Sequence, residues 1–207
     1  MRVGIVLGGG GVRGAAWLMG TLHGLVEETG WDPATADLMI GTSAGALVAA
    51  LAAAGARPWD SLAPERRELL DGLWRAAAFR PTPSLRSLGP GSLPLAARAA
   101  LSGPGQVMKV VAGLAPHGYM STDPIEELIR EQVSGGWPAR KQLWVVATDF
   151  ATGARVVFAR RNKPAVELAR AVAASCAVPG FYRPVEIAGR TYVDGGVESG
   201  ANLDLAA

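Results

Sequence analysis

Short apolar runs alternate with segments of helical periodicity over the first 55 residues. Residues 3–7 form one apolar run, ended by four glycines, and residues 38–40 form a second run, ended by Gly41. Apolar positions at helical spacing follow the first run at residues 13–28, and an alanine-rich segment expected to be helical follows the second at residues 44–54. Continuous apolar strands that alternate with helices are typical of parallel sheets with both faces covered. This part of the chain therefore predicts an α/β fold.

The pattern changes between residues 57 and 120, where many of the 14 prolines fall. Helices are expected at residues 65–78, 93–101 and 106–114, and no strand. We interpret 57–120 as a helical, proline-rich insertion that forms a cap or lid. Its large apolar side chains would either contact acyl chains or an interface, or pack against the core. These side chains are Trp59, Trp74, Phe79, Leu85, Leu88 and Met108.

Regular α/β patterning returns after residue 120. Asp123 followed by a proline predicts a helix start with Asp123 as the N-cap. We predict helices at 123–133 and 164–174, strands at 143–147 and 155–159, and a hairpin of 185–187 with 191–193. The whole chain, 1–207, is then one domain, a three-layer α/β/α sandwich with a mostly parallel central sheet.

Composition and charge exclude several classes of protein. Twenty basic and 18 acidic residues leave a net charge of +2, which does not indicate a nucleic-acid partner. One cysteine excludes an internal disulfide, and two histidines disfavour a metal site. No apolar stretch is long enough to span a bilayer, and the first apolar run lacks a signal-peptide cleavage site. We therefore expect a cytoplasmic protein, able to associate with membranes at their surface.

Residues 41–45 match the pattern G-x-S-x-G at the junction of a strand and a helix. A serine on such a tight turn exposes its hydroxyl at the edge of the sheet, and the glycines permit the strained backbone. The match indicates Ser43 as a nucleophile. The alternative is a glycine turn in which Ser43 only caps the helix.

The glycine loop at residues 8–14 has two interpretations. Gly9, Gly11 and Gly14 satisfy the G-x-G-x-x-G fingerprint of dinucleotide-binding proteins. That fingerprint also requires an acidic residue at the end of the second strand, where this chain has Gly41-Thr42-Ser43. The other interpretation is an oxyanion hole made by backbone N–H groups at a helix N-terminus, with Arg13 adding positive potential.

A serine nucleophile needs a general base. His23 lies on the first predicted helix and His117 in the proline-rich insertion, so neither has the expected place in a loop after a strand. Asp194, followed by two glycines, ends a predicted strand and can take the proton instead. The alternative is an ordinary Asp-Gly turn.

Together these segments resemble the patatin-like phospholipase family. Three blocks match its G-G-G-x-R-G loop (9–14), its nucleophile elbow (41–45) and its D-G-G sequence (194–196). A fourth block, 174–185, is similar to the A-S-x-A-x-P segment that precedes the family's aspartate. Order and spacing agree over residues 1–56 and about 120–200. Family members continue well past D-G-G, so we expect the C-terminal part of the family domain to be missing.

The resemblance implies a serine lipid acyl hydrolase of the phospholipase A or lysophospholipase type. Ser43 would be the nucleophile and Asp194 the base, in a dyad without histidine. The N–H groups of Gly10 and Gly11 would form the oxyanion hole, supported by Gly9 and Arg13. Ser175, Cys176 and Pro179 would shape the turn that brings the Asp194 strand beside Ser43. No cofactor and no metal is expected.

The expected partner is a lipid or phospholipid acyl ester, with peripheral membrane contact and no nucleic acid. An acyltransferase with the same elbow is a second hypothesis, although such enzymes commonly have histidine where this chain has Thr42. A non-catalytic lipid- or partner-binding module is a third. The sequence leaves the oligomeric state open.

Overall fold

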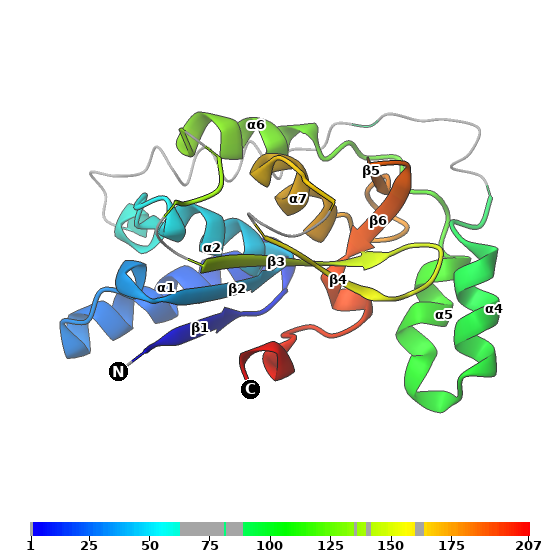
Figure 1. Ribbon diagram of the computed structural model, residues 1–207, viewed down its shortest axis with the longest axis horizontal. Coiled ribbons are helices and arrows are strands. Elements are labelled where there is room, and N and C mark those ends of the chain that lie inside the picture. Colours follow the sequence, from blue (N-terminus) through cyan, green and yellow to red (C-terminus); the bar gives the residue numbers. More distant parts are fainter. Residues whose placement is uncertain (1, 63–80, 82–88, 135, 140–141, 160–163) are drawn as a thin grey trace.

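The computed structural model describes residues 2–62, 81, 89–134, 136–139, 142–159 and 164–207 (Figure 1). In this part of the chain a six-stranded mixed sheet has the order β1-β2-β3-β6-β5, with β4 paired to β3. The strands are β1 (Gly4–Leu7), β2 (Leu38–Thr42), β3 (Gln142–Asp149), β4 (Arg155–Phe158), β5 (Val185–Ile187) and β6 (Arg190–Asp194). The helices are α1 (Gly11–Thr29), α2 (Ala44–Ala53), α4 (Leu93–Leu101), α5 (Val107–Leu114), α6 (Asp123–Gln132) and α7 (Leu168–Ser175). Short 3₁₀ turns are η1 (Pro33–Thr35), η2 (Pro58–Leu62), η5 (Pro104–Gln106), η6 (Gly195–Val197) and η7 (Leu203–Ala206).

The three-layer α/β/α class predicted from the sequence is confirmed, with helices on both sides of the sheet. The expectation of a mostly parallel sheet needs correction in detail. Strands β1, β2 and β3 pair in parallel, whereas every pairing that involves β4, β5 or β6 is antiparallel. The cause is local, because two tight turns with positive φ, at Gly153 and at Ala188-Gly189, fold the chain back on itself.

Strands β2 and β6 meet end to end along one edge of β3. Thr42, the last residue of β2, pairs with Val146, and Asp194, the last residue of β6, pairs with Ala147. Strand β4 occupies the opposite edge, since it pairs with both Val146 and Ala147. The carboxyl ends of β2 and β6 therefore point at each other over neighbouring residues of β3.

Helix α2 lies at the centre of the helical layer, against β2 and β3 and between α1 and α7 (Figure 1). All ten of its residues are buried, and most are alanine. Such small side chains let helix and sheet approach closely, so α2 enters the core directly from the turn that carries Ser43.

Several predicted boundaries move. Thr122, not Asp123, is the N-cap of α6, and α7 begins at Leu168 rather than at Pro164. The Val166 carbonyl accepts a hydrogen bond from the Trp137 indole at 2.7 Å, and the next residue has extended backbone angles. Because this long-range contact engages the Val166 carbonyl, α7 begins only at Leu168.

The expected helices at 93–101 and 106–114 are present as α4 and α5, which pack together as an antiparallel pair at one end of the molecule (Figure 1). The helix expected at 65–78 lies outside the described residues, as do Trp74, Phe79, Leu85 and Leu88. Trp59 is fully buried in the main core, so for this residue the second alternative, packing against the core, holds. No described helix is long and apolar enough to cross a membrane.

Candidate active site

Ser43 occupies a strained turn between β2 and α2. Its backbone angles are φ 54° and ψ −123°, a conformation that residues other than glycine rarely adopt. The residue stands at the N-cap position of α2, yet its side chain makes no capping hydrogen bond. The simple capping role is therefore not what the Ser43 hydroxyl performs in the structure.

The two glycines of the elbow are required by close backbone contacts. A Cβ atom on Gly41 would lie 2.4 Å from the Ala46 Cα, and a Cβ on Gly45 would lie 2.0 Å from the Leu7 carbonyl oxygen. Both distances are far below van der Waals contact. Only glycine lets α2 leave the sheet at this angle and hold Ser43 at its edge.

Ser175 fixes the turn that carries Ser43 through two hydrogen bonds. Its buried hydroxyl accepts a hydrogen bond from the Ser43 backbone N–H at 2.9 Å and donates one to the Val146 carbonyl at 2.6 Å. The end of α7 is thereby tied both to the turn and to β3. Besides its expected role in the turn before β6, Ser175 therefore contacts the backbone of the nucleophile directly.

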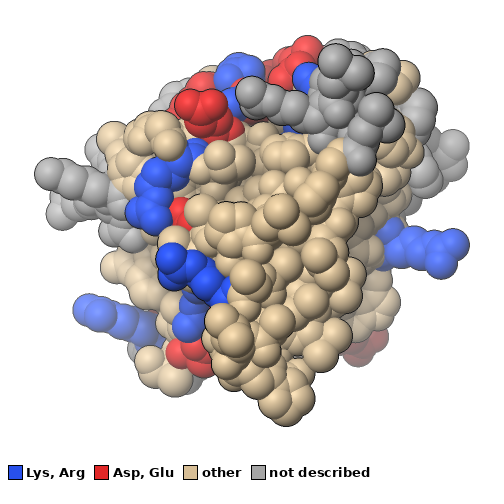
Figure 2. Space-filling model, turned by 90° about the vertical axis from the view of Figure 1, so that its right-hand side faces the viewer, with Lys and Arg blue, Asp and Glu red and all other residues tan. Residues whose placement is uncertain are grey.

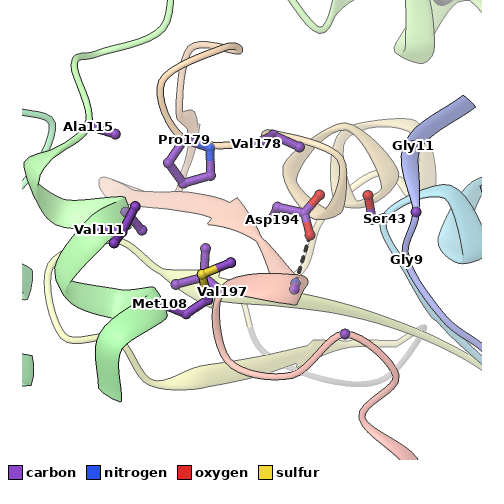
Figure 3. Close-up of a pocket in the computed structure, with 14 residues that line it drawn as sticks. Gly9, Gly11, Ser43, Met108, Val111, Ala115, Val178, Pro179, Asp194 and Val197 are labelled. Carbon is purple, nitrogen blue, oxygen red and sulfur yellow. Dashed lines mark hydrogen bonds between the residues drawn. The ribbon is translucent and has the colours of Figure 1, made fainter. Parts of the chain in front are cut away.

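Asp194 ends β6 and faces Ser43 across the pocket (Figure 3). Its Oδ1 accepts the Gly196 N–H at 2.7 Å, and its own N–H donates to the Ala177 carbonyl at 2.9 Å. The other carboxylate oxygen, Oδ2, is buried and forms no hydrogen bond of regular geometry among the described residues, although the Ser43 hydroxyl is close enough to lower the pKa of the carboxyl group. A buried acceptor without a partner is costly and is a common feature of functional sites.

Burial changes the acidity of this carboxyl group. Removal from water raises the pKa of Asp194 from 3.8 to about 6, against smaller opposite effects of the Ser43 hydroxyl and the Gly196 N–H. Only 5% of the residue is exposed. A base with a pKa near 6 is largely ionised at neutral pH and still binds a proton better than an exposed aspartate does.

The glycine loop lies beside the nucleophile. A Cβ on Gly9 would lie 3.3 Å from the Ser43 Cβ, and α1 begins two residues later at Gly11. The N–H of Gly9 donates to the Gly200 carbonyl at 2.8 Å. The N–H groups of Gly10 and Gly11 have no acceptor within the described part of the chain. These two groups, at the N-terminus of a 19-residue helix, are free to bind an anion.

The remaining candidates lie away from the pocket. Arg13 is exposed on α1 and does not line it, so its supporting role stays a prediction. His23 is partly buried on α1, and the His117 ring packs edge-on against Phe150, with 6.0 Å between ring centroids. Neither histidine lines the pocket. The described residues also contain no group of three or more side chains suited to hold a metal ion.

A pocket with a volume of about 370 Å³ is lined by the glycine loop, Ser43 and Asp194 together (Figure 3). Gly10, Gly11, Ser43 and Asp194 form its polar end. The rest of its lining is largely apolar and includes Met108. The apolar lining is Met108, Val111, Ala112, Ala115, Val178, Pro179 and Val197.

Sequence reasoning missed the loop that closes the site from the C-terminal side. Gly200 accepts from Gly9, and the fully buried Asn202 donates to the Thr42 hydroxyl at 3.0 Å. Asn202 has a left-handed backbone, which asparagine tolerates well. A lone Asn after a Gly-rich turn carries no recognisable pattern, so only the fold reveals its contact with the elbow.

Two comparisons relate this chain to known proteins. A family model described as Patatin-like phospholipase matches residues 5–207. Among solved structures, the chain is similar to VipD from Legionella pneumophila, with 18% identity and a TM-score of 0.51. The alignment covers 96% of this chain and 46% of VipD, so the chain spans about half the length of that protein. At this identity the likeness shows a shared fold.

Proposed function

The chain belongs to the patatin-like phospholipase family, and we propose that it is a serine lipid acyl hydrolase that uses a Ser43–Asp194 dyad. One observation carries the proposal. The carboxylate of Asp194 is buried with an unpartnered oxygen, and it faces a serine held in a strained turn at the end of an apolar pocket.

In the first step the Ser43 Oγ attacks the carbonyl carbon of an acyl ester. Asp194 accepts the hydroxyl proton as the new C–O bond forms, and the carbonyl oxygen becomes an oxyanion. The unoccupied N–H groups of Gly10 and Gly11, with the positive end of α1 behind them, would stabilise that charge. When the tetrahedral species collapses, the bond to the alcohol breaks and Asp194 returns the proton to the leaving oxygen.

The second step releases the acyl group. Asp194 takes a proton from water, and the resulting nucleophile attacks the acyl-serine carbonyl carbon. Collapse breaks the ester bond to Ser43 and releases the fatty acid, while the proton returns to Ser43 Oγ. The dyad is thereby regenerated, and the scheme uses no cofactor or metal.

The residues of the glycine loop have different roles in this scheme. Gly9 donates its N–H to Gly200, so we propose that it supports the hole through packing beside Ser43 and not through a hydrogen bond to substrate. Gly10 and Gly11 remain the donors. Arg13 lies on the exposed side of the first turn of α1, where it can only add to the positive potential at a distance.

The pocket supports an acyl chain as the bound group. Its walls beyond the dyad are formed by aliphatic side chains and Met108, and they offer an extended hydrocarbon chain contacts without polar competition. A fatty acyl ester would therefore bind with its carbonyl at the polar end and its chain toward α5.

Release of fatty acid from phosphatidylcholine and lysophosphatidylcholine tests the proposal. We expect turnover by the unmodified protein, and its loss to background in Ser43→Ala and Asp194→Asn. Ser102→Ala is a matched control, because this serine is exposed at the end of α4 and lies outside the pocket. Equal activity of Ser43→Ala and the unmodified protein would refute the proposed mechanism.

A further inference from the structure

Helix α5 exposes apolar residues where a surface helix normally carries polar ones. Val107 and Met108 are each 62% exposed, and Val111 and Leu114 are each 56% exposed. The four positions share one face of the helix. Ala112 and Gly113, which face α4 and the rest of the protein, are buried. Because both sides of α5 are apolar, burial against the protein alone does not explain its composition.

Helix α4 continues the same surface. Leu93 is 59% exposed and Leu101 is 90% exposed, while Leu95, Ala96 and Ala99 are buried. We call the exposed apolar residues of the two helices the hairpin face. It consists of Leu93, Leu101, Val107, Met108, Val111 and Leu114.

Few charges interrupt this face. The only lysine of α5, Lys109, turns inward and forms an ion pair with Glu198 in the segment after η6. Arg98 is the charged residue of α4. Figure 2 looks onto the end of the molecule that carries the two helices, and it shows a broad area without Lys, Arg, Asp or Glu, with basic side chains along one side.

The hairpin face is continuous with the mouth of the candidate active site. Met108 and Val111 are largely exposed, and both also line the pocket that contains Ser43. On the other side of the mouth, Val178 is 42% exposed and lines the same pocket. Phe181, three residues later in the chain, is 41% exposed, and its ring centroid lies 6.2 Å from that of Tyr119. The pocket thus opens within the apolar surface.

We propose that the hairpin face docks on the surface of a phospholipid bilayer and delivers the acyl chain from the bilayer to Ser43. The proposal rests on the proposed function. Exposed apolar side chains enter the boundary between headgroups and acyl chains, and tyrosine beside them suits the interface. A lipid can then pass from the membrane into the pocket along Met108 and Val111 without crossing water.

The position of the mouth favours a lipid surface over another occupant. A second protein, including a second copy of this chain, would cover the mouth and separate the dyad from its substrate. A bilayer instead supplies the substrate at that point. Because the face bears little charge, docking should persist at high salt, unlike binding through basic patches.

Sedimentation with phosphatidylcholine vesicles at low and high salt tests the proposal. The test uses the full chain carrying Ser43→Ala, so that no lipid is consumed and binding is measured independently of the proposed chemistry. We add Leu101→Glu and Val107→Glu, singly and together, because neither residue lines the pocket. Leu203→Glu is the matched control, since Leu203 is 66% exposed in η7, away from α4 and α5 (Figure 1).

We expect each hairpin substitution to weaken vesicle binding roughly tenfold, and the control to leave it unchanged. In the protein with Ser43 intact, the same substitutions should leave hydrolysis of a water-soluble short-chain ester unaltered. Vesicle binding that survives the double substitution, or that falls equally in Leu203→Glu, would overturn the proposal. So would a dimer in solution that the hairpin substitutions dissociate, because the face would then be covered by a second copy.

Discussion

Replacement of Asp194 by asparagine should abolish activity and yet stabilise the fold at neutral and alkaline pH. The carboxylate is buried with one oxygen unpartnered, so the folded state bears the cost of an ionised group removed from water. An asparagine of nearly the same shape keeps an oxygen for the Gly196 N–H and removes the charge.

The magnitude follows from the pKa of Asp194. Burial raises it from 3.8 to about 6 in the folded state, so the folded protein binds this proton more tightly than the unfolded chain. The contribution of Asp194 to the free energy of unfolding is therefore fully present below pH 3.8, where the group is protonated in both states, and is lost as pH rises through 6. The loss is about 3 kcal/mol. An unpartnered amide N–H in the variant costs about 1 kcal/mol, which leaves a net gain of about 2 kcal/mol above pH 7.

Denaturant unfolding of both proteins across this pH range is the assay. The difference in free energy of unfolding, Asp194→Asn minus unmodified, should fall by about 3 kcal/mol between pH 8 and pH 3. Glu186→Gln, at an exposed position on β5, controls for the loss of one surface carboxylate and should show no comparable trend. A difference that does not vary with pH would mean that the buried carboxylate has no raised pKa, and the expected stabilisation would have no basis.

Three other predictions concern the same site. Since Asp194 acts ionised, kcat/KM for a soluble ester should fall about tenfold per pH unit below about 6, and a flat profile would exclude it as the base. Ser175→Ala removes two buried hydrogen bonds, so the free energy of unfolding in denaturant should fall by about 1–3 kcal/mol. In the same variant kcat should fall roughly tenfold or more with little change in KM, and an unchanged kcat would contradict the positioning role of Ser175. Gly45→Ala should prevent folding as judged by circular dichroism, because the new Cβ would lie 2.0 Å from the Leu7 carbonyl oxygen. Gly20→Ala, in open space on α1, should instead stabilise the protein by about 0.5–1 kcal/mol, and equal effects of the two alanines would count against the close approach.

Local sequence was sufficient to predict the elements that carry the dyad. The short apolar run before Gly41 and the alanine-rich segment after Ser43 differ in composition and meet at a glycine-bounded turn, so the elbow between β2 and α2 was recognisable. The helix pair α4 and α5 was also predicted, since its prolines and glycines mark the boundaries.

Contacts between distant segments were not predictable in this way. The end-to-end meeting of β2 and β6 depends on which edge of β3 each strand takes, and nothing in either strand specifies that edge. The late start of α7 depends on the Trp137 indole, about 30 residues earlier in the chain. The contact of Asn202 with Thr42 likewise appears only when the sheet is assembled.

Labelling with a fluorophosphonate probe, followed by mass mapping of the modified peptide, shows which serine is activated. The probe requires an activated serine and no knowledge of the natural substrate. We expect one labelled residue, Ser43, with labelling absent in Ser43→Ala and strongly reduced in Asp194→Asn. Labelling at another serine, or full labelling of Ser43 in folded Asp194→Asn, would contradict the Ser43–Asp194 dyad.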